Sequence, residues 1–301
     1  MTSGIRLETP MANAGLLLGF PEYRKPAQRL AGSKGLSYAE VAIHRFPDGE
    51  TRIRLPENMP SHVVFCRSLN KPNEKLVELV LAAAGAKAQG VEKLTLVSPY
   101  LCYMRQDKDF QPGEVICQRI IGKLLADYFA ELVTVDAHLH RVHQLSEAVP
   151  ASKAINLNAT EPMARFLVRH LEAPVLLGPD AESEQWVAAI AAREQLAYSV
   201  ARKQRFGDKQ VQVALPPDHF TGRNVVLVDD IVSTGCTLEA VAKTLARHAP
   251  ASISVLVTHA LFAEGALGRL RAAGVSNIWS CDTIIHETNA VLLADLLGGQ
   301  I

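Results

Sequence analysis

Short apolar runs alternate with longer segments of helical periodicity along the chain. The apolar runs predict strands at residues 15–20, 63–66, 94–97, 132–135, 175–177, 196–200, 225–228, 253–257 and 277–280. The segments between them predict helices at residues 73–89, 114–129, 161–170, 182–194, 237–247 and 265–272. Most of these strands are continuously apolar, which is typical of parallel strands covered on both faces. The alternation therefore predicts an α/β fold with central parallel sheets.

Two segments depart from this pattern and predict hairpins. Extended runs at residues 42–45 and 52–55 flank an Asp-Gly turn in the segment 46–50, which indicates a flap hairpin standing off the main sheet. A second hairpin is expected within residues 202–213, with its turn at residues 206–209.

A polar, proline-bearing stretch near residue 150 separates two comparable series of strands and helices. At roughly 100–200 residues per domain, a chain of 301 residues is long enough for two domains. We therefore expect one domain over residues 1–150 and a second over residues 151–301.

The charge balance narrows the choice of partners. The chain carries 31 Lys and Arg residues against 31 Asp and Glu residues, so its formal net charge is zero. Neutrality removes the general electrostatic argument for nucleic acid or an anionic membrane as a partner. An anionic ligand must therefore be held by local cation clusters or by metal ions.

The cysteines and the apolar runs indicate a compartment. The chain has five cysteines and no C-x-x-C pair: Cys66, Cys102, Cys117, Cys236 and Cys281. Free thiols in a reducing cytoplasm are the default for such a set. The start lacks a basic leader, and no apolar run approaches the roughly 18 residues needed to span a bilayer. We expect a soluble, cytoplasmic protein.

The most informative segment is 225–237, in which an apolar strand ends in two carboxylates and a hydroxyl-rich loop leads into a helix. The loop and the helix start consist of Ser233, Thr234, Gly235, Cys236 and Thr237. Their backbone N–H groups and the threonine hydroxyls can bind a phosphate. Asp229 and Asp230 would repel that phosphate, so we expect them to face sugar hydroxyls or a metal ion.

This combination resembles the phosphoribosyl-diphosphate loop of phosphoribosyltransferase-fold proteins. Further motifs occur in the order seen in ribose-phosphate pyrophosphokinases, at residues 46–50, 98–107, 134–138, 178–180, 258–259 and 281–284. The resemblance implies two tandem phosphoribosyltransferase-type domains, the first on the ATP side and the second on the ribose 5-phosphate side. It also implies transfer of the diphosphate of ATP to O1 of ribose 5-phosphate, giving phosphoribosyl diphosphate and AMP.

The same resemblance implies which residues bind the two substrates. Ribose 5-phosphate would be bound by Asp229, Asp230 and the loop 233–237. The ATP site would include Arg105, Gln106 and Asp107, because an arginine can stack on a purine or pair with phosphate while Gln and Asp read its edge. In the family, three flap residues come from a neighbouring subunit to complete the adenine pocket, which implies a homo-oligomer: Phe46, Asp48 and Glu50.

Cations and a metal ion are needed for the transfer itself. Lys203 and Arg205 are two residues apart, so an extended chain places them on the same side. Phosphoryl transfer depends on positioning and charge stabilisation, and we expect these two residues to be the catalytic pair. Mg²⁺ is expected because it bridges phosphate oxygens with few protein ligands. The family's metal ligands map to His138 and Asp180, and Asp136 is a further candidate.

The sequence departs from the better-known class of the family in two places. The second hairpin is short and resembles the archaeal-type loop, and Glu182 and Glu184 stand close after Asp180. A non-catalytic regulatory relative and a nucleobase phosphoribosyltransferase are the alternatives. Retention of Lys203 argues against the first, and the segment 105–107 argues against the second.

Overall fold

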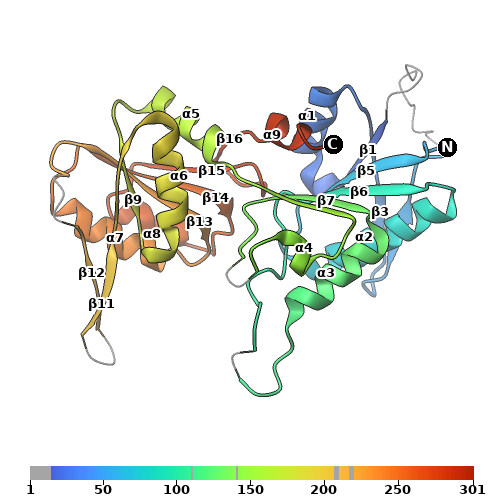
Figure 1. Cartoon of the computed structure of the whole chain (residues 1–301), viewed down its shortest axis with the longest axis horizontal. Helices are drawn as coiled ribbons and strands as arrows, with labels where there is room; N and C mark the ends of the chain where they lie inside the picture. The colour runs from blue at the N-terminus through green and yellow to red at the C-terminus, as the bar shows by residue number, and fades with distance from the viewer. Residues whose placement is uncertain (1–14, 110, 140–141, 207–209, 217–219) are drawn as a thin grey trace. The chain divides into compact units, whose positions relative to one another are not determined.

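Each half of the chain folds around a six-stranded sheet in which all strand pairs are parallel. A computed structural model describes residues 15–109, 111–139, 142–206, 210–216 and 220–301, and it leaves the side chains of residues 203–206 and 210–213 undescribed. The chain forms two units (Figure 1). Unit 1 runs to Leu157 and takes in Ala294–Ile301, and unit 2 comprises Asn158–Leu293.

Unit 1 has the strand order β2-β1-β5-β6-β7-β8. Its strands are β1 (Leu16–Gly19), β2 (Ser37–Glu40), β5 (His62–Cys66), β6 (Lys93–Val97), β7 (Glu131–Val135) and β8 (Lys153–Leu157). Its helices are the 3₁₀ turn η1 (Pro21–Tyr23), α1 (Arg24–Lys34), α2 (Pro72–Ala88), α3 (Cys117–Tyr128), α4 (Leu145–Ala148) and α9 (Ala294–Gly298). Local sequence determines where α2 begins and where α1 ends. Helix α2 begins with proline at its first turn, and α1 ends at Gly35, which adopts the left-handed conformation.

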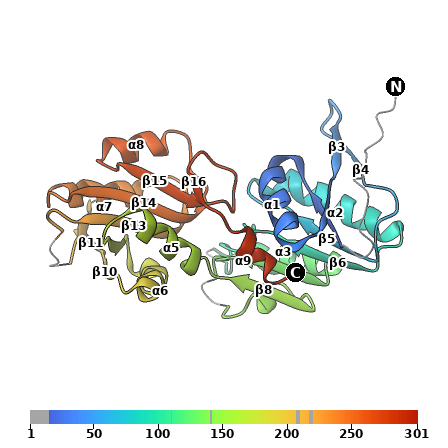
Figure 2. The ribbon, with the colours of Figure 1, turned by 90° about the horizontal axis from the view of Figure 1, so that it is seen from above.

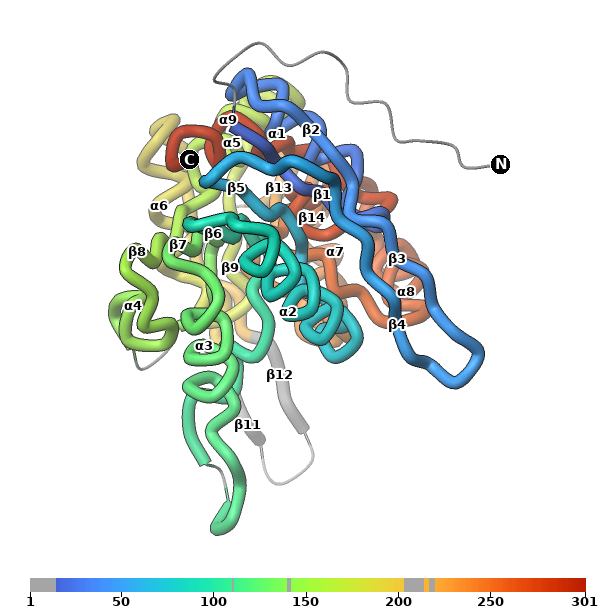
Figure 3. Tube along the Cα trace, turned by 90° about the vertical axis from the view of Figure 1, so that its right-hand side faces the viewer, coloured from blue at the N-terminus to red at the C-terminus, as the bar shows by residue number. Residues whose placement is uncertain are grey.

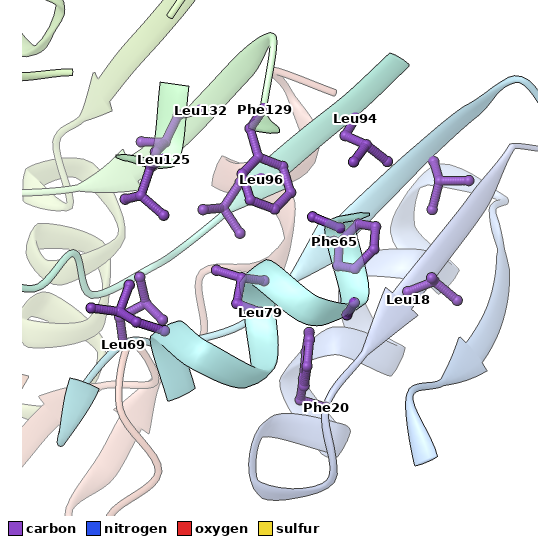
Figure 4. Packing of buried hydrophobic residues seen from close by; sticks show 14 of the residues in the cluster. Leu18, Phe20, Phe65, Leu69, Leu79, Leu94, Leu96, Leu125, Phe129 and Leu132 are labelled. Atoms are coloured by element: carbon purple, nitrogen blue, oxygen red, sulfur yellow. The ribbon is translucent and has the colours of Figure 1, made fainter. Parts of the chain in front are cut away.

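The unit 1 core lies between the sheet and helices α2 and α3. Alternate strand residues face these helices, and the packing is shown in Figure 4 for Leu18, Phe65, Leu96, Leu79 and Leu125. Each fully buried side chain of this kind contributes about 1.5–3 kcal/mol through removal of apolar surface from water. The intervening strand residues are buried on the opposite face, which explains the continuous apolar runs.

Unit 2 has the strand order β10-β9-β13-β14-β15-β16. Its strands are β9 (Val175–Gly178), β10 (Ala197–Val200), β13 (Asn224–Val232), β14 (Ser252–Ala260), β15 (Asn277–Cys281) and β16 (Asn289–Val291). Its helices are α5 (Thr160–His170), the 3₁₀ turn η2 (Ala181–Ser183), α6 (Glu184–Glu194), α7 (Cys236–Ala246) and α8 (Ala266–Ala272). Figure 2 shows α8 and α6 on opposite sides of this sheet. Helix α7 packs against one face of this sheet. Its residues Leu238, Val241 and Leu245 share a buried cluster with Val225 and Leu227 of β13.

Both predicted hairpins are present. The flap hairpin consists of β3 (Ala42–Arg45) and β4 (Thr51–Arg54), paired antiparallel. The second hairpin consists of β11 (Arg202–Phe206) and β12 (Gln210–Ala214), also antiparallel, and its turn at residues 207–209 lies outside the described residues. Figure 3 shows the flap hairpin projecting from unit 1.

The strand order of each sheet marks one place for a ligand. In unit 1 the chain adds β2 on one side of β1 and then β5 and the later strands on its other side, so the order of strands reverses between β1 and β5. In unit 2 the same reversal lies between β9 and β13. In open α/β sheets, ligands bind outside the carboxyl ends of the strands at such a reversal. Within the described part of the chain, no helix is long and apolar enough to cross a membrane.

Candidate active site

The predicted phosphate loop lies at the reversal point of unit 2. Strand β13 carries Asp229 and Asp230 near its carboxyl end, and helix α7 begins at Cys236. The residue before the helix, Gly235, has φ of 74°, a left-handed conformation that other residues adopt only with strain. Glycine at this position therefore permits the sharp turn from strand to helix.

The loop offers donors to an anion. No side chain caps the start of α7. Among the described residues, no hydrogen bond uses the backbone N–H groups of Thr234, Gly235 or Cys236. Unpaired N–H groups at the start of a helix attract phosphate through both hydrogen bonding and the helix dipole. Thr234 and Cys236 are exposed and Gly235 between them is buried, so solvent reaches the loop at the residues on either side of the glycine.

Three carboxyl groups lie close together beside this loop. Burial first, and then the negative charges of Asp230 and Asp180, raise the pKa of Asp229 to about 8. Asp180 follows β9, the strand paired with β13. Ser183 fixes the turn at Asp180, because its hydroxyl donates to the Asp180 carbonyl oxygen over 2.6 Å. The cluster favours a ligand that brings positive charge or hydroxyl donors.

These carboxyl groups suit Mg²⁺, whose ligands are hard oxygen atoms. Among the described residues, no three His, Cys, Asp or Glu side chains converge as a ready metal site. A cation here would therefore take one or two carboxylates from the protein and complete its shell with water or substrate oxygens. Asp180 and Asp229 are the residues that would hold it.

In unit 1, the segment 105–107 follows β6 and precedes α3. Gln118, a buried residue of α3, anchors this segment: its Nε2 donates to the Met104 carbonyl over 3.2 Å, and its N–H donates to the Gln106 carbonyl over 3.3 Å. Arg105 is exposed, whereas Gln106 and Asp107 are partly buried. The anchored backbone leaves the guanidinium in solvent, accessible to a ligand.

His138 lies in the segment after β7, the strand next to β6. Two residues earlier, Asp136 is buried with φ of 40°, and its N–H donates to the Leu157 carbonyl over 2.8 Å. The Ala137 N–H donates to Oδ1 of Asn156 over 2.8 Å. These bonds fix the backbone that leads to His138, which is partly exposed.

The flap tip carries Phe46, Asp48 and Glu50, and all three are exposed. The turn is closed by the Phe46 N–H, which donates to the Glu50 carbonyl over 2.8 Å, and by the Glu50 N–H, which donates to Asp48 Oδ1 over 3.1 Å. The tip projects away from the segment between β6 and α3 (Figures 1 and 3).

Lys203 and Arg205 lie in β11, opposite Val213 and Val211 of β12. Their side chains lie outside the described residues. Their backbone positions are two apart in an extended strand, as the predicted catalytic pair requires. Glu182 in η2 and Glu184 in the first turn of α6 are both exposed. Acidic side chains near a helix N-terminus interact favourably with the helix dipole.

The structure brings Asp180, Asp229 and Asp230 to one edge of unit 2, beside the loop 233–237. Two residues that the sequence did not indicate fix the backbone of the site. Ser183 binds the Asp180 carbonyl, and Gln118 binds the Met104 carbonyl just before Arg105. Asp180 and Ser183 stand three positions apart, which is the spacing of the two residues of a capping box, and this spacing is a signal for such a turn. No comparable signal marks Gln118.

Family models match most of unit 1 and nearly all of unit 2. The chain matches the family model "N-terminal domain of ribose phosphate pyrophosphokinase" over residues 17–128 and the phosphoribosyl transferase domain model over residues 154–292. The crystal structure of phosphoribosylpyrophosphate synthetase from Mycobacterium smegmatis has a TM-score of 0.79 with 19% identity, and the match covers 95% of this chain and 97% of that chain. This likeness shows a shared fold.

Archaeal relatives match over nearly their whole length. A ribose-phosphate pyrophosphokinase from Methanopyrus kandleri is 30% identical over 282 residues, which cover 93% of this chain and 96% of that protein. One from Thermococcus kodakarensis is 34% identical over 245 residues, which cover 81% of this chain and 85% of the relative. Because the matches span both units in order, the chain belongs to the ribose-phosphate pyrophosphokinase family.

Proposed function

We propose that the protein is a Mg²⁺-dependent ribose-phosphate pyrophosphokinase, which transfers the diphosphate of ATP to O1 of ribose 5-phosphate. The observation that carries this proposal is the anion-binding loop at the reversal point of unit 2, beside three carboxyl groups. Its relatives from two archaea carry the name of this activity. ATP and a sugar phosphate are cytoplasmic metabolites, so we place the protein in the cytoplasm.

In this proposal, unit 2 binds ribose 5-phosphate. The N–H groups and hydroxyls of residues 233–237 hold its 5-phosphate, because these donors converge at the start of α7. Asp229 and Asp230 accept hydrogen bonds from the ribose hydroxyls, which an anionic phosphate would not offer. Mg²⁺, which Asp180 and Asp229 would hold, would supply charge neutralisation for the diphosphate when bound. His138, in unit 1, stays a predicted metal ligand.

ATP binding is assigned to unit 1 through Arg105, Gln106 and Asp107. Phe46, Asp48 and Glu50 complete the adenine pocket of another subunit. The flap tip is exposed and the flap hairpin projects from unit 1 (Figure 3), which supports this assignment. We therefore propose a homo-oligomer in which each nucleotide site uses two subunits.

The transfer step is a single displacement at the β-phosphorus of ATP. The ribose O1 hydroxyl forms a bond to this phosphorus, and the bond from the phosphorus to the α,β-bridging oxygen breaks. AMP leaves with that oxygen, and the hydroxyl proton passes to water. Lys203 and Arg205 stabilise the charge on the transferring group, which is the main requirement of phosphoryl transfer.

One assay tests the proposal. Purified protein is incubated with ATP, Mg²⁺ and ribose 5-phosphate, and AMP and phosphoribosyl diphosphate are followed by ³¹P NMR. We expect both products in equal amounts and none without Mg²⁺. Absence of AMP above background would reject the proposal. In that event, consumption of phosphoribosyl diphosphate with a nucleobase would identify a phosphoribosyltransferase, and a changed rate of an added active synthetase would identify a regulator.

A further inference from the structure

Arg269, on helix α8, contacts the backbone of the phosphate loop from outside the loop. Its Nη2 donates a hydrogen bond to the carbonyl oxygen of Thr234 over 2.7 Å. The contact joins the helix after β14 to the turn after β13. It is a charge-assisted bond, about twice as strong as one between neutral groups.

This bond determines where the next N–H group points. In a trans peptide, the C=O and the following N–H point in opposite directions. Because the Thr234 carbonyl points at Arg269, the Gly235 N–H points away from α8. The preceding peptide is held similarly, since the Ser233 carbonyl accepts the Ala263 N–H over 2.9 Å. Two successive N–H groups are thereby turned toward the same side of the loop, away from residues 263–269.

The peptide between Thr234 and Gly235 needs such a restraint. Glycine adopts positive and negative φ almost equally well, so Gly235 itself imposes little preference on the peptide. A rotated peptide would place a carbonyl oxygen, which carries partial negative charge, where a phosphate oxygen has to sit. The Arg269 bond favours the orientation that presents the donor.

Arg269 is itself oriented by the helix that the loop precedes. Its Nε lies 3.5 Å from Oε2 of Glu239 on α7, and Glu239 Oε1 accepts a hydrogen bond from Lys243 Nζ over 2.7 Å. The Arg269 side chain is 43% exposed, so it contributes little to the apolar core. Its removal is therefore expected to disturb the loop more than the fold.

We propose that Arg269 is a positioning residue for the phosphate of ribose 5-phosphate, acting by fixing the Thr234–Gly235 peptide with its N–H toward the ligand. That the ligand is ribose 5-phosphate rests on the proposed function. Arg269 does not need to touch the sugar phosphate, because its guanidinium binds the loop on the opposite side.

The test compares Arg269→Ala with a matched control on the same helix. Arg271 is exposed, and among the described residues no hydrogen bond or ion pair joins its side chain to the loop, so Arg271→Ala removes the same charge from α8. Calorimetry measures ribose 5-phosphate binding to each variant without ATP. We expect Arg269→Ala to raise Kd about tenfold or more and Arg271→Ala to change it less than about twofold. Arg269→Lys, which retains one donor, should recover part of the affinity.

Kinetics and stability separate positioning from a general structural role. In Arg269→Ala, KM for ribose 5-phosphate should rise about tenfold, while KM for ATP stays within about twofold and the thermal unfolding midpoint is unchanged. Unchanged ribose 5-phosphate binding would overturn the inference. Equal losses for both substrates together with a lowered midpoint would also overturn it.

The binding assay keeps this inference separate from the proposed reaction. If the wild-type protein binds ribose 5-phosphate or inorganic phosphate but forms no phosphoribosyl diphosphate, the proposed function fails and the Arg269 comparison still gives an answer. If the wild-type protein binds neither, the inference fails as well. An amide NMR signal for Gly235 that shifts with phosphate in the wild type and not in Arg269→Ala would support it directly.

Discussion

Arg67 and Glu78 form an ion pair that is closed off from solvent at the carboxyl edge of the unit 1 sheet. The two side chains are 0% and 1% exposed. The other oxygen of Glu78 accepts a hydrogen bond from Arg45, the last residue of β3, over 2.8 Å. Glu22 also binds Arg67, over 2.7 Å. Charged side chains therefore lie at the reversal point of unit 1, and Glu78 connects this cluster to the base of the flap.

Glu78→Ala should destabilise the protein strongly. Removing one partner of a buried pair leaves an uncompensated charge, and we expect a loss of about 3 kcal/mol, at the low end for such pairs because Glu22 still faces Arg67. Urea unfolding followed by circular dichroism measures it. Glu74 is exposed and lies 3.7 Å from Arg45, so Glu74→Ala should cost less than about 1 kcal/mol. Equal losses for the two variants would contradict the expected role of the buried pair.

The flap prediction can be tested by mixing two variants at an ATP concentration low enough that each variant alone is nearly inactive. Phe46→Ala removes the exposed ring at the flap tip and should raise KM for ATP with little effect on KM for ribose 5-phosphate. Lys203→Ala should lower turnover by orders of magnitude while ribose 5-phosphate still binds. If the flap serves a neighbouring subunit, a hybrid dimer contains one intact site.

Random reassembly of the two variants as dimers should then restore about a quarter of wild-type activity, because half of the dimers are hybrids with one working site of two. Each variant dissociated and reassembled alone is the control and should gain nothing. Mixtures that never exceed the mean of the two variants would show that the flap acts within its own subunit. A monomer with full activity would also show that the flap acts within its own subunit.

Much of the fold follows from the hydrophobic pattern. The buried parallel strands and both hairpins were predicted from continuous apolar runs and turn sequences, and the structure confirms them. The edge strands β2, β8 and β16 were missed, because they are short and partly exposed and so lack a long apolar run. Helix α1 was missed as well. Its sequence is mostly polar and contains a proline, and it buries only four residues of eleven.

The site was predictable where side-chain chemistry marks it. Two aspartates after an apolar strand indicated the loop 233–237, and the rule that parallel strands end at one edge accounts for Asp180 lying near Asp229. The Arg269 bond was not predictable. It joins a side chain to a backbone carbonyl 35 positions away. Every residue has a backbone carbonyl, so the residue type at position 234 does not indicate such a bond.

Asp229 should make the metal-free protein less stable as the pH rises. Its folded pKa of about 8 lies above the unfolded value of 3.8, so the folded state holds a proton that the unfolded chain has already lost. The stabilising effect of that proton is complete below the unfolded value and is lost as pH rises through about 8. The stability gain of Asp229→Asn over wild type should therefore grow from about pH 5 to pH 8.

Thermal unfolding with and without Mg²⁺ measures this gain, each kcal/mol appearing as a rise of about 2 °C or less in the midpoint for a chain of this length. Mg²⁺ should reduce the gain, because the cation neutralises the ionised cluster. Glu182→Gln, an exposed acid in the same region, is the control and should show no pH-dependent gain. A constant gain for Asp229→Asn across this range would reject the raised pKa.

Cys236 should report occupancy of the phosphate loop. It is the exposed one of the five cysteines, whereas Cys66, Cys102 and Cys281 are buried and Cys117 is partly buried. N-ethylmaleimide should therefore modify Cys236 first, and ribose 5-phosphate should slow that modification about tenfold or more, because a bound ligand blocks access to the thiol. Peptide mapping by mass spectrometry gives the rate at each site. The rate at Cys117 serves as the internal control and should not change with ribose 5-phosphate. If saturating ribose 5-phosphate leaves the Cys236 rate unaltered, the sugar phosphate does not bind at this loop.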